Sequence, residues 1–343
     1  MSKVIFLVLN ADDMGGIERA TFSLSDVLKN KGYETKIYSL HKNDNSFFCR
    51  DDIIYLDSSK SDFFKLYDFI SESYKKDDII ISMYDRISIM LNWISILQIN
   101  KIKLVANQHA DYFAHSILVR FLRKISYSRC DAIIALTEKD KSLYCDNINN
   151  KNIHNIGNIL KIDDVNIKEF TNRSIDIIAV GRLDPIKRFE DVVSIFNTTQ
   201  YKTEIYGSGH DLNRLLSLSY NDDIFKGSTS NIYSKMADSK ILLVTSIRES
   251  FSMVILEAMS MGCIVISYNC PTGPSELIKD GFNGFLIENG DVNAMKNKCI
   301  DVMENKIDVD SIRINAIKFA NNYTPEVIAN KWISILKSVK NVN

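Results

Sequence analysis

The chain has 343 residues, of which 45% are hydrophobic and 25% are charged, and its net charge is −1. Such a length and balance indicate a globular protein of about two domains, and the near-neutral charge argues against nucleic acid as a partner. No apolar run approaches the length of a membrane span, and the six cysteines contain no C-x-x-C pair, which is typical of buried thiols in a reducing compartment. We therefore expect a cytoplasmic protein, unless it binds peripherally at the inner face of the cytoplasmic membrane.

The first half alternates apolar runs with helical patterns. Val4–Asn10 is a continuous apolar run, which predicts a strand buried on both faces. Gly15-Gly16 lies between this strand and a helix expected from about Ile17, where backbone could approach an anionic ligand, although paired glycines are more often an ordinary turn. Further strands are predicted at 35–39, 53–56, 79–83, 104–107 and 132–137, so we expect a doubly wound parallel sheet.

Two features near the end of this half could serve function. His109 falls at the carboxyl end of the strand at 104–107, where a structural role is equally plausible, and His115 follows six residues later. The helix expected at 116–129 carries apolar residues on one face and cations on another. Its apolar face is interpreted as core with a solvated charge stripe, and the alternative is an in-plane contact with anionic lipid. The apolar residues are Ile117, Leu118, Phe121, Leu122 and Ile125, and the cations are Arg120, Arg123 and Lys124.

The polar stretch 150–164 is predicted to be a linker, and 175–180 is predicted to open a second sheet. Asp184 is a suitable N-cap for a helix that begins at Pro185. Lys187 and Arg188 would then place two cations in the first helical turn, against the helix dipole, which predicts a bound anion there. A glycine loop, Gly207-Ser-Gly209, follows a strand expected at 204–206. Residues 224–227 are expected to form a further short strand.

An apolar strand at 241–244 leads to Glu249, and a helix with apolar residues at spacings of three and four ends at Gly262. Glu249 therefore sits just past the carboxyl end of a strand, where open parallel sheets bind ligands, and Glu257 lies on the following helix. Taken singly, each glutamate is more simply a helix cap or a solvated residue. A last helix is expected from Pro325, with Thr324 as its N-cap.

Glu249 and Glu257, with Ser-Phe-Ser after the first, resemble the E-x7-E signature of retaining glycosyltransferases of family 4. The resemblance spans nearly the whole chain and is strongest from 181 to 286. It implies the α/β GT-B fold, with two Rossmann-like doubly wound domains facing a central cleft. Residues 1–160 would form the acceptor-side domain, residues 165–322 the nucleotide-sugar domain, and residues 323–343 a helix that crosses back to the first domain.

The resemblance also implies site residues, and it implies neither a metal nor a cofactor. Arg182 and Lys187 match the family's diphosphate clamp, while His109 and Glu249 match residues beside the donor sugar. Glu257 would accept hydrogen bonds from the ribose hydroxyls. The residues implied in substrate binding are Gly15, Gly16, Glu18, Gly207, Phe225, Ser250, Phe251, Ser252 and Glu257.

The implied activity is transfer of a hexosyl or N-acetylhexosaminyl group, with retention, from a nucleotide-sugar to a glycan or polyprenyl-diphosphate-linked acceptor. UDP-sugar is the family's commonest donor, and the implied process is cell-surface polysaccharide biosynthesis of O-antigen, capsule or lipopolysaccharide type. The helix at 116–129 would then contact an anionic membrane. Two alternatives stay open, namely a GT-B sugar-nucleotide epimerase and a non-catalytic sugar-nucleotide-binding scaffold subunit.

Overall fold

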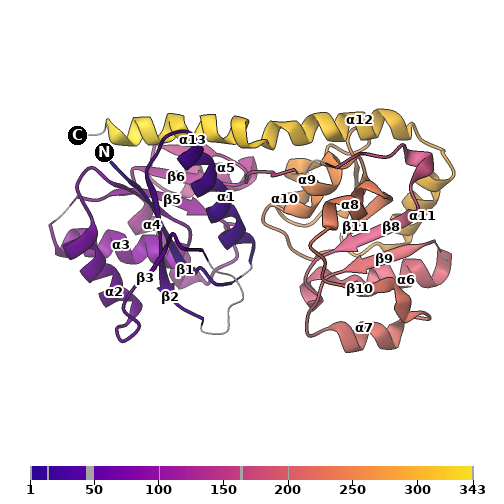
Figure 1. Cartoon of the computed structure of the whole chain (residues 1–343), viewed down its shortest axis with the longest axis horizontal. Helices are drawn as coiled ribbons and strands as arrows, with labels where there is room; N and C mark the ends of the chain where they lie inside the picture. The colour runs from indigo at the N-terminus through magenta and orange to yellow at the C-terminus, as the bar shows by residue number, and fades with distance from the viewer. Residues whose placement is uncertain are drawn as a thin grey trace. The chain divides into compact units, whose positions relative to one another are not determined.

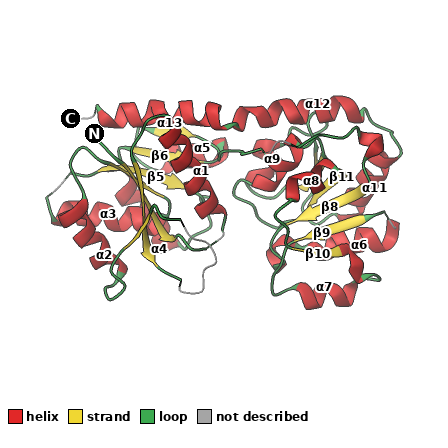
Figure 2. Ribbon diagram, in the orientation of Figure 1, coloured by secondary structure: helices red, strands yellow, loops and turns green. Residues whose placement is uncertain are grey.

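The computed structural model describes residues 2–13, 15–43, 50–99, 101–162, 165–199 and 201–341. Backbone contacts divide it into a first unit, Met1–Ile159 with Pro325–Asn343, and a second unit, Leu160–Thr324. Each unit is a parallel sheet with helices packed on it (Figures 1 and 2). Within the described ranges, no helix is both long and apolar enough to cross a membrane.

The sheet of the first unit has seven parallel strands in the order β3-β2-β1-β4-β5-β6-β7. The order reverses between β1 and β4, as in Rossmann-like sheets. The strands are β1 (Val4–Asn10), β2 (Thr35–His41), β3 (Ile53–Tyr55), β4 (Ile79–Ser82), β5 (Lys103–Gln108), β6 (Ala132–Ala135) and β7 (Ile153–Asn155). The helices are α1 (Gly16–Asn30), α2 (Asp62–Asp68) continued by a short π-helix (Phe69–Ser73), α3 (Asp85–Leu97), α4 (Ile117–Tyr127), α5 (Glu138–Asn147) and α13 (Pro325–Lys340).

The prediction of a linker at 150–164 is wrong for its first part. Ile153–Asn155 pairs in parallel with β6 as the seventh strand, and Ile153, Ile156 and Ile159 are buried. Single isoleucines among asparagines and lysines gave an apolar pattern too weak to predict a strand. The strand forms because β6 lies beside it and provides its pairing partner. Asp163 and Asp164, at the end of that stretch, lie outside the described residues.

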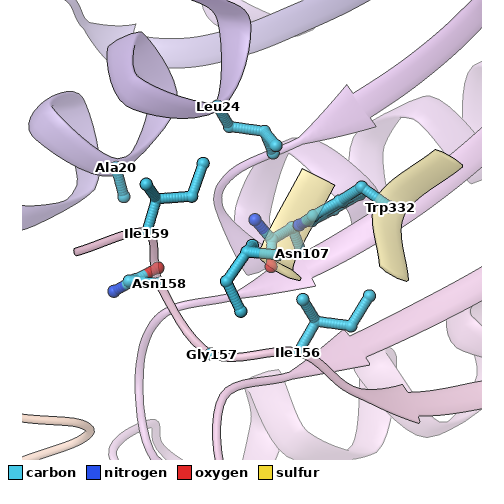
Figure 3. A pocket seen from close by; sticks show the side chains of 9 residues that line it. Ala20, Leu24, Asn107, Ile156, Gly157, Asn158, Ile159 and Trp332 are labelled. Atoms are coloured by element: carbon cyan, nitrogen blue, oxygen red, sulfur yellow. The ribbon is translucent and has the colours of Figure 1, made fainter. Parts of the chain in front are cut away.

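The last helix belongs to the first unit. Ile328, Trp332, Leu336 and Val339 are buried along the predicted face of α13, which packs on α1 and β4. A cavity of about 10 Å³, with room for one water molecule, remains where α1, α13 and residues 156–159 meet (Figure 3). The helix is therefore part of the core of the first unit.

The second unit repeats the plan with six parallel strands in the order β10-β9-β8-β11-β12-β13, reversing between β8 and β11. The predicted fold class, two Rossmann-like domains with parallel sheets, is thus confirmed. The strands are β8 (Ile175–Val180), β9 (Thr203–Tyr206), β10 (Phe225–Gly227), β11 (Ser239–Val244), β12 (Ile264–Tyr268) and β13 (Phe285–Ile287). The helices are α6 (Phe189–Thr199), α7 (Leu212–Leu218), α8 (Ile232–Ala237), α9 (Met253–Ser260), α10 (Gly273–Leu277), α11 (Val292–Met303) and α12 (Val309–Ala320), with short 3₁₀ turns at Phe170–Asn172, Pro185–Lys187, Asp222–Ile224 and Asn321–Tyr323.

The cysteines follow the prediction of buried thiols with one exception. Cys130, Cys263, Cys270 and Cys299 are buried, and burial raises the pKa of the Cys130 thiol to about 12. Cys145 is exposed on α5, so the prediction is wrong there. Cys49 lies outside the described residues.

Replacing Trp332 with alanine is expected to destabilise the first unit by about 3–5 kcal/mol, because the indole is buried where α13 meets α1. Hydrogen exchange resolved by peptide should show faster exchange in β1 and β4, with β11 and β12 unchanged. Lys337→Ala, on the exposed side of α13, is the matched control. Equal exchange rates in wild type and Trp332→Ala would contradict the placement of α13 in this core.

Candidate active site

The candidate site of the second unit lies at the reversal of its strand order. The loop after β8 carries Arg182 and Lys187, and the loop after the adjacent β11 carries Glu249. Adjacent strands whose connections leave in opposite directions open a crevice at their carboxyl ends, which is the usual ligand site of such sheets. Two backbone carbonyls of the first loop accept hydrogen bonds from the second: the Lys187 carbonyl accepts from Thr245 Oγ1 at 2.7 Å, and the Ile186 carbonyl accepts from the Ile247 amide at 2.9 Å.

Lys187 and Glu249 form an ion pair across these loops. Lys187 Nζ lies 2.5 Å from Glu249 Oε1, and Ser246 Oγ donates to the same oxygen at 2.7 Å. The Glu249 carbonyl also accepts from the Gly273 amide at 3.0 Å. The two side chains are 25% and 11% exposed, so solvent screens the pair less than it would a surface pair. Both ends of the pair are therefore held in place before any ligand binds.

The prediction that Lys187 and Arg188 lie in a first helical turn, against the helix dipole, is wrong. Asp184 does act as an N-cap, accepting from the Ile186 amide at 3.0 Å, but it caps only the 3₁₀ turn Pro185–Lys187. Arg188 then adopts a left-handed conformation with φ 49°, and α6 begins after it with two acidic residues in its first turn. The cations therefore precede the helix and do not oppose its dipole.

Arg182 is the exposed cation of the site. Its side chain is 73% exposed, and its Nε lies 3.7 Å from Asp184 Oδ2. A surface pair at that distance contributes little, so the guanidinium can turn toward an anion with small loss. Lys187 is held by Glu249, whereas Arg182, only five residues away, is largely exposed.

Ser252 is the strained residue of the site. It adopts φ 65° and ψ 74°, the left-handed region that is uncommon for residues other than glycine, directly before α9. Its side chain is buried, and among the described residues its Oγ has no hydrogen-bond partner. Strain and an unpaired polar atom at a helix N-terminus together mark a position where an anion or hydroxyl could bind.

The other end of α9 is closed by two buried arginines that the sequence pattern did not single out. Gly262, with φ 68°, caps the helix as predicted. Arg173 Nη2 donates to the Met261 carbonyl at 2.8 Å, and Arg313 Nε donates to the Gly262 carbonyl at 3.1 Å. Cations at a helix C-terminus stabilise its dipole and satisfy carbonyls that have no partner within the helix. Their long sequence separation from α9 explains why no local pattern could reveal them.

The remaining predicted residues of this unit divide between packing and exposure. A Cβ at Gly207 would lie 1.8 Å from the Gly181 carbonyl oxygen, so close packing of two loops already requires glycine there. Phe225 is half-buried against the core of the unit. The Phe251 ring is buried against Tyr323 at 5.6 Å, so only the backbone of Phe251 could meet a ligand. Ser250 precedes it at the same strand edge, and Glu257 is half-buried on α9.

In the first unit, Glu18 and Tyr84 meet at the other reversal of strand order. Tyr84, which follows β4, donates its hydroxyl hydrogen to Glu18 Oε1 at 2.5 Å. Burial raises the pKa of Glu18, and the tyrosine hydrogen bond opposes that rise. Gly15 is the N-cap of α1, and a Cβ there would approach Glu18 Oε2 to 2.5 Å. Gly15 therefore leaves room for the glutamate, whereas Gly16 is exposed with open space beside it.

His109 lies just after β5. Asn107 Nδ2 and His109 Nε2 are 3.1 Å apart, which fits a neutral imidazole that accepts at Nε2 and carries its proton on Nδ1. Burial lowers the pKa of His109 to about 4, so the ring is uncharged at neutral pH. It can act there as a hydrogen-bonding group, but not as a cation.

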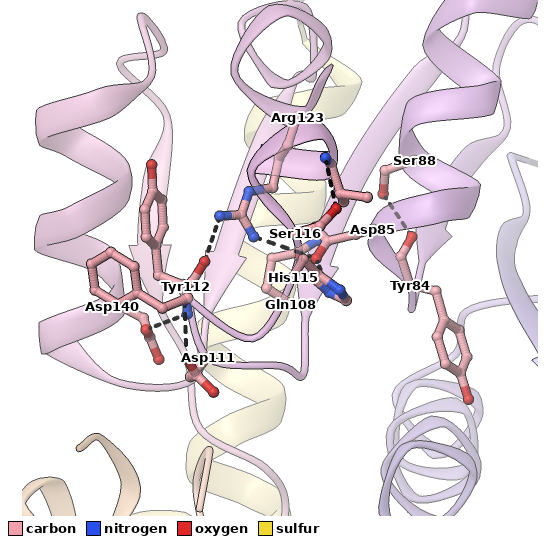
Figure 4. A network of polar contacts seen from close by, with 12 residues as sticks. Tyr84, Asp85, Ser88, Gln108, Asp111, Tyr112, His115, Ser116, Arg123 and Asp140 are labelled. Carbon is pink, nitrogen blue, oxygen red and sulfur yellow. Dashed lines mark hydrogen bonds and ion pairs between the residues drawn. The ribbon is translucent and has the colours of Figure 1, made fainter. Parts of the chain in front are cut away.

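His115 belongs to a polar network that sequence reasoning missed. Its Nε2 lies 2.7 Å from Oδ2 of the buried Asp85, and this hydrogen bond raises the pKa of His115. The same carboxylate accepts from Tyr127. It also lies 3.4 Å from Arg123 Nη1 (Figure 4). Asp85 begins α3, one residue after Tyr84, so the network adjoins the reversal of strand order. The apolar residues around Arg123 in the sequence suggested that Arg123 was a solvated cation, so its place in this network was not predicted.

The apolar side of α4 does not face the core. Ile117, Leu118, Phe121 and Ile125 are 77%, 67%, 59% and 44% exposed, whereas Arg123 is buried. The prediction that this side of the helix is core is therefore wrong, and contact of the helix with an anionic membrane stays a prediction.

The comparisons with known proteins agree with this fold. Residues 161–319 match the family model described as Glycosyl transferases group 1. The chain is 27% identical to the amylovoran biosynthesis glycosyltransferase AmsD of Erwinia amylovora, over 98% of this chain and 100% of the relative. It is 24% identical, over 99% and 100%, to the Campylobacter jejuni GalNAc-alpha-(1->4)-GalNAc-alpha-(1->3)-diNAcBac-PP-undecaprenol alpha-1,4-N-acetyl-D-galactosaminyltransferase.

Solved structures share the whole architecture. Anabaena HepE in complex with UDP matches with a TM-score of 0.80 at 17% identity, over 98% of this chain and 100% of HepE. The lipopolysaccharide outer core galactosyltransferase WaaB matches with a TM-score of 0.78 at 19% identity, over 98% and 99%. The fold is GT-B. With the family match, these findings support a place in the GT-B glycosyltransferase superfamily.

The predicted site residues thus fall into two sets, each at the carboxyl edge of its own sheet. In the second unit, Lys187 and Glu249 are in direct contact, with Arg182 on the same loop as Lys187. In the first unit, Glu18 pairs with Tyr84, and His109 pairs with Asn107. Among the described residues, no group of three histidine, cysteine, aspartate or glutamate side chains could hold a metal ion.

Glu18→Gln is expected to leave the first unit as stable as wild type or more stable at pH 7.5. A raised pKa in the folded state means that ionised Glu18 costs stability, and this cost grows as pH rises above about 4.5. The advantage of the variant should therefore shrink as pH falls toward that value. Thermal unfolding at pH 5 and 7.5 measures this. Glu34→Gln is the control, because Lys3 lowers the pKa of Glu34 and its replacement should bring no gain.

His109→Gln is expected to weaken the pH dependence of stability on the acid side. Between its unfolded pKa of 6.5 and its folded pKa of about 4, the unfolded chain binds a proton that the folded chain excludes. The unfolding free energy of wild type should therefore fall from pH 6.5 to 5, by at most about 2 kcal/mol more than in the variant. Denaturant melts at the two pH values test this, with exposed His210→Gln as control. Equal losses in all three proteins would contradict it.

Proposed function

We propose that the chain is a retaining glycosyltransferase that moves a hexosyl or N-acetylhexosaminyl group from a UDP-sugar to a glycan or polyprenyl-diphosphate-linked acceptor. The product belongs to a cell-surface polysaccharide of O-antigen, capsule or lipopolysaccharide type. Two relatives support this proposal through their names, one in amylovoran biosynthesis and one for an undecaprenol-linked acceptor. The solved complex of HepE with UDP supports the choice of nucleotide.

The observation that carries the proposal is the ion pair of Lys187 and Glu249 at the reversal of strand order. Leaving of a nucleoside diphosphate concentrates negative charge on its phosphates, so the transition state needs fixed cations and amides beside them. Lys187 is such a fixed cation, and the exposed Arg182 closes on the same phosphates from the neighbouring end of the loop. The amides at the start of α9, next to Ser252, add the positive end of a helix dipole.

Glu249 contacts both the lysine of the phosphate site and, in this proposal, the donor sugar. Its Oε1 accepts from Lys187 and Ser246, which keeps the lysine in position while the phosphate site is empty. We assign the hydroxyls of the donor sugar to the same carboxylate and to the backbone of residues 250–252, and the ribose hydroxyls to Glu257. When the diphosphate binds, Lys187 shares its charge between carboxylate and phosphate.

The first unit supplies the acceptor side. Gly15, Gly16 and Glu18 lie at the start of α1, where we assign the acceptor and the donor phosphates. We assign neutral His109 to the donor sugar, to which it offers hydrogen bonds without adding charge. We assign no protein nucleophile. The acceptor hydroxyl attacks from the face that the diphosphate leaves, its proton passes to a phosphate oxygen, and the configuration at the anomeric carbon is retained.

Arg182→Ala is expected to lower kcat/KM about 10²–10³-fold, the usual loss for one hydrogen-bond donor to the transition state. The variant should stay folded, because the Arg182 side chain is 73% exposed. Lys187→Gln should be at least as severe, because it also leaves Glu249 without its cation. Lys202→Gln, an exposed lysine at the opposite end of the sheet, is the control. UDP release and glycan product are measured with a panel of UDP-sugars, with and without a metal chelator. Wild-type rates in Arg182→Ala would contradict the proposed clamp.

The same assay separates the alternatives. Turnover of sugar nucleotide without acceptor would indicate an epimerase, and UDP-sugar binding without any release of UDP would indicate a scaffold subunit. Product with inverted anomeric configuration, determined by NMR, would contradict retention. Loss of all activity with the chelator, restored by a divalent ion, would contradict a metal-independent reaction.

A further inference from the structure

His109 can offer a ligand either a hydrogen-bond donor or an acceptor, depending on which ring nitrogen carries the proton. The ring is uncharged at neutral pH, because burial lowers its pKa to about 4. Its Nε2 lies 3.1 Å from Asn107 Nδ2, and among the described residues no protein group bonds its Nδ1. The group that decides whether Nε2 is protonated therefore also decides what Nδ1 presents to a ligand.

An asparagine amide can meet a histidine nitrogen in two ways. Its nitrogen donates to an unprotonated Nε2, or, with the amide turned over, its oxygen accepts from a protonated Nε2. The two arrangements have the same shape, and they leave the ring proton on Nδ1 and on Nε2, respectively. A second partner of the Asn107 amide must therefore decide between them.

That second partner is Met83. Met83 and Asn107 lie at the carboxyl ends of the adjacent strands β4 and β5, where Ser82 pairs with Ala106. Asn107 Nδ2 lies 3.6 Å from Met83 Sδ, and both side chains are buried. A thioether sulfur can accept a hydrogen bond but cannot donate one, so it favours the amide nitrogen over the amide oxygen at this position. With the nitrogen on this side, Nε2 of His109 has to accept.

The cavity beside Trp332 completes the arrangement. Asn107 lies in its wall together with Asn158 (Figure 3), and its volume of about 10 Å³ has room for one water molecule. Asn107 Oδ1 is buried and, within the described part of the chain, has no hydrogen-bond partner. Buried polar atoms are nearly always paired, and a water in this cavity is the donor that Oδ1 lacks. Such a water holds the oxygen of the amide while Met83 holds its nitrogen.

We propose that Asn107 is a positioning residue, held by Met83 and by one water molecule in this cavity, that fixes the proton of His109 on Nδ1. His109 then presents a hydrogen-bond donor, and not an acceptor, to an oxygen of its ligand. Because Nδ1–H cannot accept, a bound hydroxyl must direct its own hydrogen elsewhere, which limits the orientations in which a sugar binds. That the ligand is the sugar of a nucleotide-sugar rests on the proposed function, whereas the position of the proton does not.

The test is ¹⁵N NMR of the five histidines of the full chain at pH 7.5, with the His109 signals assigned by His109→Gln. In wild type, Nδ1 should give the signal of a protonated nitrogen and Nε2 that of an unprotonated one, the reverse of the tautomer that a free histidine side chain prefers in water. Asn107→Asp should move the proton to Nε2, because both carboxylate oxygens accept. Met83→Leu, a change that nearly conserves volume, should give a measurable share of the Nε2 tautomer.

Asn92→Asp is the matched control. Asn92 is a buried asparagine of the same unit that also donates to a sulfur, that of Cys130 at 3.4 Å. Its replacement should leave the His109 signals and kcat/KM for a UDP-sugar unchanged. Asn107→Asp should lower kcat/KM at least about tenfold, because two acceptors then face each other where wild type has a hydrogen bond. A high-resolution crystal structure should show one water about 2.8 Å from Asn107 Oδ1.

Four outcomes would overturn the proposal. They are a wild-type proton on Nε2, an unchanged tautomer in both Asn107→Asp and Met83→Leu, a cavity without water, and an unchanged kcat/KM in a variant whose tautomer has moved. If Asn107→Asp does not fold, Met83→Leu decides the assignment. A wild type that has the expected tautomer but turns over no UDP-sugar would reject only the proposed function.

Discussion

The reversal of strand order beside β1 and beside β8 is the constraint on which the rest of this structure depends. The carboxyl ends of parallel strands all lie at one edge of the sheet. Where the strand order reverses, the connections from two adjacent strands leave that edge in opposite directions, which opens a crevice between them. In the second unit this brings Lys187 and Glu249 into contact across 62 residues of sequence. In the first unit it brings Glu18 to Tyr84 across 66 residues. The candidate chemistry therefore lies where the topology leaves room for it.

Helix α9 shows how the second unit supports such a site electrostatically. Its C-terminal carbonyls are bound by Arg173 and Arg313, which compensates the negative end of the dipole inside the protein. The positive end is left at Ser252, whose strained backbone and unpaired hydroxyl lie directly before the helix. Lys187, already paired with Glu249, completes a region in which added negative charge meets oriented dipoles and needs little rearrangement.

Much of the fold was predictable because it depends on local patterns. The continuous apolar runs gave most of the strands, Gly262 marked the end of α9, and the spacing of Trp332 and its neighbours gave the buried face of α13. The spacing of Glu249 and Glu257 gave one loop and its helix. What could not be predicted depended on distant partners. The strand β7 needs β6 beside it, and the cap of α9 by Arg173 needs a residue 88 positions away.

The predictions from local sequence were least accurate for charged residues whose environment differs from that of an ordinary solvated side chain. Arg123 looked like a solvated cation, but Asp85, 38 residues earlier, and Tyr112, 11 residues earlier, give it partners in the interior. Lys187 was predicted in a first helical turn, but Arg188 has a left-handed backbone and α6 begins only after it. For Arg123 a charged partner distant in sequence decided the outcome, whereas for Lys187 the left-handed backbone of the next residue did.

The division of the chain gives the two units different histories during synthesis. The second unit is one continuous segment, Leu160–Thr324, inserted within the first, which is completed only by α13. On a ribosome the second unit can fold as soon as it emerges, whereas the sheet of the first unit must wait for Trp332 and its neighbours with part of its core uncovered. A nascent chain therefore completes last the unit whose strands it synthesises first.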